Sequence, residues 1–192
     1  DLTKKFEHVE VADAQSVTLY GGTLPGRSGE LHFPISVMLQ ILAGDFTSIL
    51  YRILRDEKHL LYHVGTSTDR ADTFGVFAFH MNIAPENIQQ AIDIIKQEVD
   101  KAANGEIADD RISLAKTRIK AREIFSQQTV QSLADSDVTT TLLFPNLSTP
   151  DEWLARIEAV TKDDLIAAAK HIRDHLTVLA ICSNKPEAKY EF

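Results

Sequence analysis

The sequence contains one cysteine, Cys182, and no apolar run of about 18 residues, the length that a membrane-spanning helix requires. A single cysteine excludes an internal disulfide and any zinc site built on a Cys-x-x-Cys pair. Because Cys182 stands in an apolar stretch, we interpret it as a packing residue. No signal-peptide pattern follows Asp1, and the low cysteine usage is compatible with either the cytoplasm or the periplasm.

The sequence also has no basic surplus, since the formal net charge is −8. The densest basic stretch, Lys116, Arg118, Lys120 and Arg122, alternates along a predicted helix with acidic residues around it, as on a solvated helix face. We therefore expect no nucleic-acid partner. The motifs Gly-x-Ser-x-Gly, the P-loop and Gly-x-Gly-x-x-Gly are absent as well.

The 192 residues, 44% hydrophobic and 25% charged, suit one globular domain. No repeat or Pro/Gly/Ser-rich linker divides the chain, so we expect a single domain over residues 1–192. The polar start without methionine suggests a fragment, or a processed product, of a longer protein.

Alternation of side chains and turn residues predicts strands over 16–20, 60–67, 73–83 and 177–182. Helical periodicity predicts helices over 33–43, 46–56, 85–104, 109–128 and 133–144, and two more that start after Thr149 and Thr161. Strands do not alternate singly with helices. The order therefore predicts an α+β fold, with an antiparallel sheet and helices packed mainly on one face. Both faces of the 73–83 strand are largely apolar, so we expect it to be central and covered on each side.

Two histidine pairs have the spacing of a zinc-peptidase helix, but neither predicts a metal site. His59 and His63 straddle a loop and a strand, where residues four apart lie roughly 13 Å apart along the axis. His171 and His175 are better placed, at a helix end, where the helix dipole alone favours histidine. His8, His32 and His80 have no metal-ligand spacing. We therefore expect no cofactor in this chain.

Residues 41–62 resemble a hallmark of the second domain of M16 peptidases, the pitrilysin and mitochondrial-processing-peptidase family. The family pattern is a glycine-rich turn, Ser-x-Leu on a helix, Leu-Arg-Glu, and Gly-Leu-Ala-Tyr opening a strand. Here Gly44, Ser48-Ile49-Leu50, Leu54-Arg55-Asp56 and His59-Leu60-Leu61-Tyr62 stand in that order. Thr161-Lys162-Asp163-Asp164-Leu165 resembles the family's closing helix, and the resemblance covers roughly residues 16–183.

The resemblance implies a LuxS/MPP-like metallohydrolase half that closes like a clamshell with a homologous domain around a peptide. That partner carries the zinc and its His-x-x-Glu-His sequence, and this chain resembles the half without them. In some active members the second half supplies an Arg and a Tyr seven residues apart, and Arg55 and Tyr62 match them. They would bind the peptide substrate or support the transition state.

The departures from the pattern leave an alternative, a catalytically inactive M16-like structural or interaction domain. Only one glycine remains in the turn, and His59 and Leu61 replace the Gly and Ala before Tyr62. A third hypothesis is a self-sufficient enzyme that uses His171 and His175. Replacing both with alanine without loss of activity would dispose of it.

Overall fold

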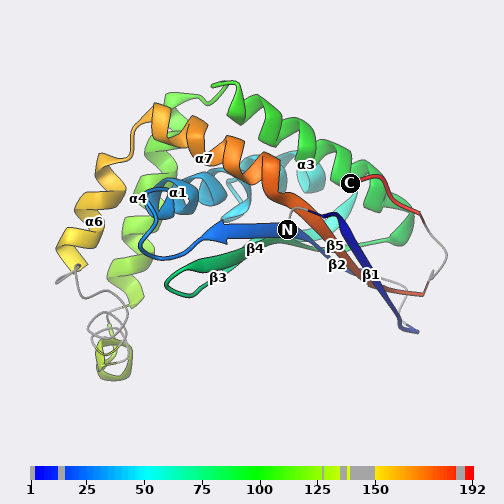
Figure 1. The fold of residues 1–192 in the computed structure, drawn as a ribbon, viewed down its shortest axis with the longest axis horizontal. Coiled ribbons are helices and arrows are strands. Elements are labelled where there is room, and N and C mark those ends of the chain that lie inside the picture. The colour runs from blue at the N-terminus through cyan, green and yellow to red at the C-terminus, as the bar shows by residue number, and fades with distance from the viewer. Residues whose placement is uncertain (1–2, 13–15, 127, 135–137, 139–149, 185–188) are drawn as a thin grey trace.

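The computed structural model describes residues 3–12, 16–126, 128–134, 138, 150–184 and 189–192. Five strands form one sheet in the order β1-β5-β2-β4-β3 (Figure 1). The strands are β1 Lys5–Glu10, β2 Ser16–Pro25, β3 Leu61–Arg70, β4 Phe74–Ile83 and β5 Leu176–Ser183. The helices are α1 His32–Ala43, α2 Ile49–Tyr51, the π-helix Arg52–Glu57, the 3-10 turn Pro85–Asn87, α3 Ile88–Ala103, α4 Asp109–Ser126, α6 Pro150–Ala159 and α7 Lys162–His175.

The helices lie on one side of the sheet, which confirms the predicted α+β layering (Figure 1). α1 is almost wholly buried, because α4 and α7 pack against it as well as the sheet. The core side chains of β2, β4 and β5 point toward this helical layer. Between them stand exposed or half-buried side chains, as expected of a sheet that is covered on one face. No helix among the described residues has the length and apolar character needed to cross a membrane.

The sheet is mixed, whereas the sequence predicted an antiparallel one. The sequence did not predict β1, which pairs parallel with β5. The other pairings among the described strands are antiparallel. The side chains of Lys5–Glu10 are nearly all exposed or half-exposed. An edge strand of this kind carries little of the alternating hydrophobic signal on which strand prediction depends.

β4 is central, as predicted, but the described chain covers only one of its faces. Phe77 and Phe79 are buried under the helices, whereas Phe74 is 63% and Val76 is 47% exposed on the opposite face. The expectation of cover on both sides was therefore wrong for this chain alone. The apolar residues of the open face still need an explanation.

β2 continues past Gly21-Gly22, where the sequence predicted its end. A Cβ on Gly21 would lie 1.9 Å from the Phe77 carbonyl oxygen, and one on Gly22 would lie 1.6 Å from that of His175. These glycines therefore permit close backbone packing at a β-bulge and do not form a turn.

Most helix boundaries were predicted to within a few residues. Thr161 and Asp164 form the expected capping box at the start of α7. Gly105 ends α3 with a φ of +84°, the left-handed conformation that favours glycine. The predicted helix over 133–144 and the cap at Thr149 fall almost entirely outside the described residues.

Candidate functional site

Arg55 lies on a π-helix, a widened turn that carries the chain from α2 into β3. The Lys58 amide donates to the Ile53 carbonyl (3.0 Å) and the Leu60 amide to that of Leu54 (2.8 Å). His59 then adopts a φ of 53°, and its Nδ1 lies 3.0 Å from the Arg55 carbonyl oxygen. The widened turn and the left-handed residue reverse the chain within a few residues, so Arg55 and Tyr62 face the same space.

The structure brings together the two residues that the resemblance selected. The guanidinium carbon of Arg55 lies 5.0 Å from the centre of the Tyr51 ring and 5.2 Å from that of Tyr62. Tyr62 is the extra residue of a β-bulge, because Leu61 pairs with Ile83 and His63 with the neighbouring Asn82. The bulge frees the Tyr62 side chain from the strand's alternation, and it is 68% exposed.

A cleft of about 400 Å³ begins beside this pair, between β3, β4 and the turn after α1. Its lining includes Tyr51, whose ring contacts Arg55, and His63, which follows Tyr62 in the sequence. Arg55 and Tyr62 themselves stand next to the lining residues and are not part of the lining. Asp45, Phe46, Gly65 and His80 also line it. Side chains of this kind offer apolar contact together with a few hydrogen-bonding groups, as peptide and small-molecule sites do.

His63 and His80 stack across β3 and β4, with ring centres 5.5 Å apart. Gly65 makes room for them, because a Cβ there would lie 2.5 Å from Cε1 of His80. Burial, and then the neighbouring His63, lower the pKa of His80. His80 is therefore neutral at neutral pH and can accept or donate a hydrogen bond inside the cleft.

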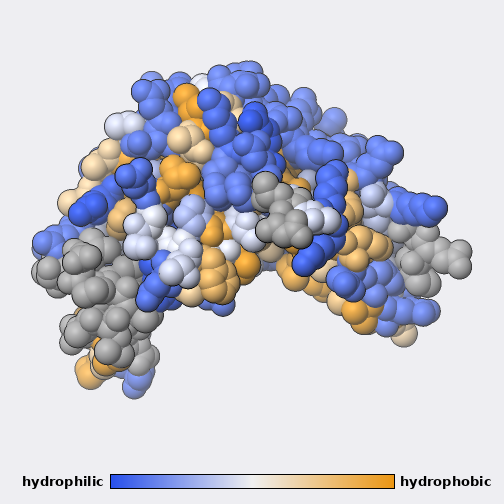
Figure 2. All heavy atoms as spheres, in the orientation of Figure 1, coloured by the Kyte–Doolittle hydropathy of each residue, from blue (hydrophilic) through white to orange (hydrophobic). Residues whose placement is uncertain are grey.

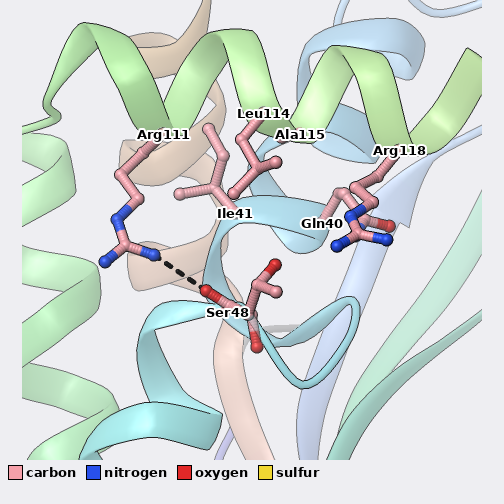
Figure 3. A pocket seen from close by; sticks show the side chains of 8 residues that line it. Gln40, Ile41, Ser48, Arg111, Leu114, Ala115 and Arg118 are labelled. Carbon is pink, nitrogen blue, oxygen red and sulfur yellow. Dashed lines mark hydrogen bonds between the residues drawn. The ribbon is translucent and has the colours of Figure 1, made fainter.

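The turn before α2 is fixed from two sides. The Asp45 carboxylate accepts from the Thr47 amide (2.7 Å) and from Nε2 of Gln40 (3.0 Å). From α4, Nη1 of Arg111 donates to the Thr47 carbonyl oxygen (2.8 Å; Figure 3). The crevice between Arg111 and this turn measures about 10 Å³, which is room for one water molecule. We therefore interpret these residues as holding the turn in place and not as a ligand site.

Three further histidines, His8, His171 and His175, make their contacts outside this cleft. His171 and His175 stack on α7 with ring centres 3.8 Å apart. Nε2 of His171 lies 3.2 Å from the Thr23 carbonyl oxygen, and Nδ1 of His175 lies 2.8 Å from that of His171. Nε2 of His8 meets the Ser183 hydroxyl at 2.9 Å. Within the described ranges, no group of three or more His, Cys, Asp or Glu side chains could hold a metal ion.

Sequence reasoning selected Arg55 and Tyr62 but missed His63 and His80 as neighbours of the same cleft. The signal was available in part. His80 follows Phe74, Val76 and Ala78 on one strand face, and Gly65 inside a strand indicates a close approach by another group. The missing information was the register that sets Gly65 opposite His80.

Comparison with known proteins concerns the family and the fold of the chain. The family model described as the peptidase M16 inactive domain matches residues 1–119. An uncharacterized zinc protease of Streptomyces coelicolor is 25% identical over 171 residues, which are 86% of this chain and 37% of that protein. The probable inactive metalloprotease YmfF of Bacillus subtilis is 26% identical over 144 residues, 73% of this chain and 33% of that protein.

The fold is also found in a solved structure. The chain superposes on the crystal structure of a peptidase M16 inactive domain from Pseudomonas fluorescens with a TM-score of 0.82 at 16% identity. The match covers 99% of this chain and 45% of the P. fluorescens chain. The chain thus spans less than half the length of these relatives. The family model matches more than half of the residues, and the fold is that of the P. fluorescens domain. The chain therefore belongs to the peptidase M16 inactive-domain family.

Proposed function

We propose that this chain is the substrate-binding, zinc-less half of an M16-type zinc metalloendopeptidase. The zinc, with its His-x-x-Glu-His sequence, would belong to a partner domain in the same polypeptide or to a separate subunit. The observation that carries the proposal is the Arg55–Tyr62 pair, in which the exposed Tyr62 ring has its centre 5.2 Å from the guanidinium carbon of Arg55. Tyr51, which also contacts Arg55, lines the cleft beside the pair.

The chemistry of the pair suits peptide hydrolysis. A guanidinium and a phenol both donate hydrogen bonds to oxygen, and a guanidinium adds charge. Both can bind a peptide carbonyl in the ground state. Either can also stabilise the oxyanion that forms when zinc-bound water attacks that carbonyl. A half that supplies donors without the metal fits a family whose model is described as inactive.

The open sheet face supports the need for a partner. Val17, Leu19, Phe74 and Val76 are between 41% and 63% exposed. Val17 and Leu19 stand at one end of the β2–β4 pair, where they face Asn82 and His80, and Phe74 and Val76 stand at the other end. Figure 2, in which the sheet lies below the helices, shows hydrophobic side chains along this lower side. Large apolar side chains exposed along one face of a sheet favour a protein–protein interface. We infer that the partner domain packs against it.

The alternative is a catalytically inactive structural or interaction domain of the same fold. It is favoured by the B. subtilis relative, which is named a probable inactive metalloprotease. In that case Arg55 would only pack between Tyr51 and Tyr62. The two proposals make opposite predictions about catalysis, because only the first needs Arg55 to contact a substrate.

The test separates and recombines the two halves. Zinc content and cleavage of a fluorogenic peptide are measured for this chain, for the polypeptide that carries His-x-x-Glu-His, and for the two together. The peptidase proposal predicts zinc only in the second polypeptide and rapid cleavage only in the mixture. One tightly held zinc in this chain, or equal cleavage by the zinc-bearing polypeptide alone, would contradict it.

A further inference from the structure

Arg70, the last residue of β3, is a cation buried against the start of α1. It is only 8% exposed. Its Nη1 lies 2.6 Å from Nδ1 of His32 and donates to the His32 carbonyl oxygen (3.0 Å). The Ser36 hydroxyl lies 3.5 Å from the same nitrogen. The hydrogen-bonding capacity of Nη1 is thus satisfied.

The other edge of the same guanidinium has no partner. Nε and Nη2 are both buried, and neither finds a hydrogen-bond acceptor within the described part of the protein. None of the ion pairs between described residues includes Arg70. A buried charge that lacks a counter-charge is unfavourable, so an unsatisfied cation at this depth indicates that a group is missing.

The surroundings add positive potential. Burial, and then the charge of Arg27, lower the pKa of Arg70 to about 10, which leaves it protonated at neutral pH. His32 is the first residue of α1, and no acidic residue stands in that helix's first turn. The uncompensated amide dipoles of a helix N-terminus favour an anion. Arg70, Arg27 and the start of α1 therefore all favour the same kind of ligand.

The shape of the vacant edge selects among anions. Nε–H and Nη2–H lie side by side in the guanidinium plane and point the same way, which matches the two oxygens of a planar carboxylate. A polar groove of about 330 Å³ lies nearby, and its lining includes Ser36, which contacts Nη1 of Arg70. Thr66, Thr68, Arg122 and Trp153 are among the residues that line it.

We propose that the Nε–Nη2 edge of Arg70 is a binding site for a carboxylate group. The carboxylate can come from a small organic acid or from a peptide, and the two oxygens would accept the two parallel N–H bonds in either case. This site lies at the opposite end of β3 from Tyr62 and does not depend on the proposed peptidase function.

The test measures ligand-dependent thermal stability of the chain at pH 7. Sodium acetate is compared with sodium chloride at equal ionic strength, and N-acetyl-trialanine with its C-terminal amide. The proposal predicts that a carboxylate raises Tm by about 2–4 °C over its matched control, because it binds the folded state only. A response to acetate identifies a site for small acids, and a response to the peptide acid alone identifies a peptide site.

Two variants test whether the carboxylate response comes from Arg70. Arg70→Lys keeps the charge but loses the fork, so it should weaken carboxylate binding by about tenfold or more. Arg70→Met removes charge and fork, and it should fold without any carboxylate response even if the lysine variant does not fold. Arg118→Lys, at an exposed arginine, should respond like the unsubstituted chain. Equal Tm values with carboxylate and control, or an undiminished response in the Arg70 variants, would overturn the proposal.

Discussion

The guanidinium of Arg55 lies 5.2 Å from the ring of Tyr62 because two local irregularities act together. The π-helix widens the last turn before β3, and the β-bulge at Tyr62 turns its ring out of the strand's alternation. Irregular backbone of both kinds is common near functional sites. Regular helix and strand geometry would leave the two side chains facing different directions.

The stacked histidines predict the effect of adding a methyl group at Gly65. Gly65→Ala would place its Cβ 2.5 Å from Cε1 of His80, so the ring or the strand must shift. We expect a loss of about 1–3 kcal/mol in the free energy of unfolding, measured by urea denaturation. In a His80→Ala background the same substitution should cost much less. Equal costs in both backgrounds would show that the two positions are not coupled.

The two faces of β4 predict opposite phenotypes for two phenylalanines. Phe79 is 0% exposed, so Phe79→Ala should cost about 3–5 kcal/mol of folding stability. Phe74 is 63% exposed, and Phe74→Ala should change the stability of the chain alone by less than about 0.5 kcal/mol. It should weaken association with the zinc-bearing half in a titration calorimeter. Unchanged association would argue against the open face as the interface.

The capping box at the start of α7 predicts a moderate effect for Thr161→Ala. The Thr161 hydroxyl accepts from the Asp164 amide (3.2 Å), and the Thr161 amide donates to the Asp164 carboxylate (2.8 Å). Loss of the cap should cost about 1 kcal/mol. Thr117→Ala, at an exposed position of α4, is the matched control and should be neutral or slightly stabilising. A cost as large at Thr117 would contradict the capping explanation.

His32 predicts a pH dependence of stability. Burial, and then the charges of Arg70 and Arg27, lower its pKa from 6.5 to about 4. As pH falls, the unfolded chain therefore takes up this proton before the folded chain does. The stability contributed by neutral His32 is complete above about pH 6.5 and is lost as pH falls toward 4.

His32→Asn keeps an acceptor for Arg70 but cannot titrate. Denaturation curves between pH 4 and 7 should show a shallower loss of stability for this variant. His80 and His171 also have lowered pKa values and contribute equally to both proteins. The difference between the two slopes therefore isolates His32, and identical slopes would contradict the assignment.

Elements with strong local signals were predictable from sequence, and elements held by tertiary contacts were not. The apolar stripe of α3 and the Thr161 cap specify their helices locally, so both were found. β1 is specified by its pairing with β5, and β2 passes Gly21-Gly22 because other backbones approach closely there. Arg55 and Tyr62 were selected through a family resemblance, and their role stays a prediction, whereas the proposed Arg70 site depends on burial that no sequence pattern encodes.

Peptide turnover by the assembled protein tests the central claim most directly. We measure kcat/KM for Arg55→Ala and Tyr62→Phe, with Arg52→Ala as control, since Arg52 lies on the same π-helix but pairs with Glu57 at the surface. Loss of a donor to the developing oxyanion should lower kcat/KM by about 10²-fold or more in each site variant and leave the control unchanged. Full activity in both site variants would contradict the claim that this chain forms part of the substrate site.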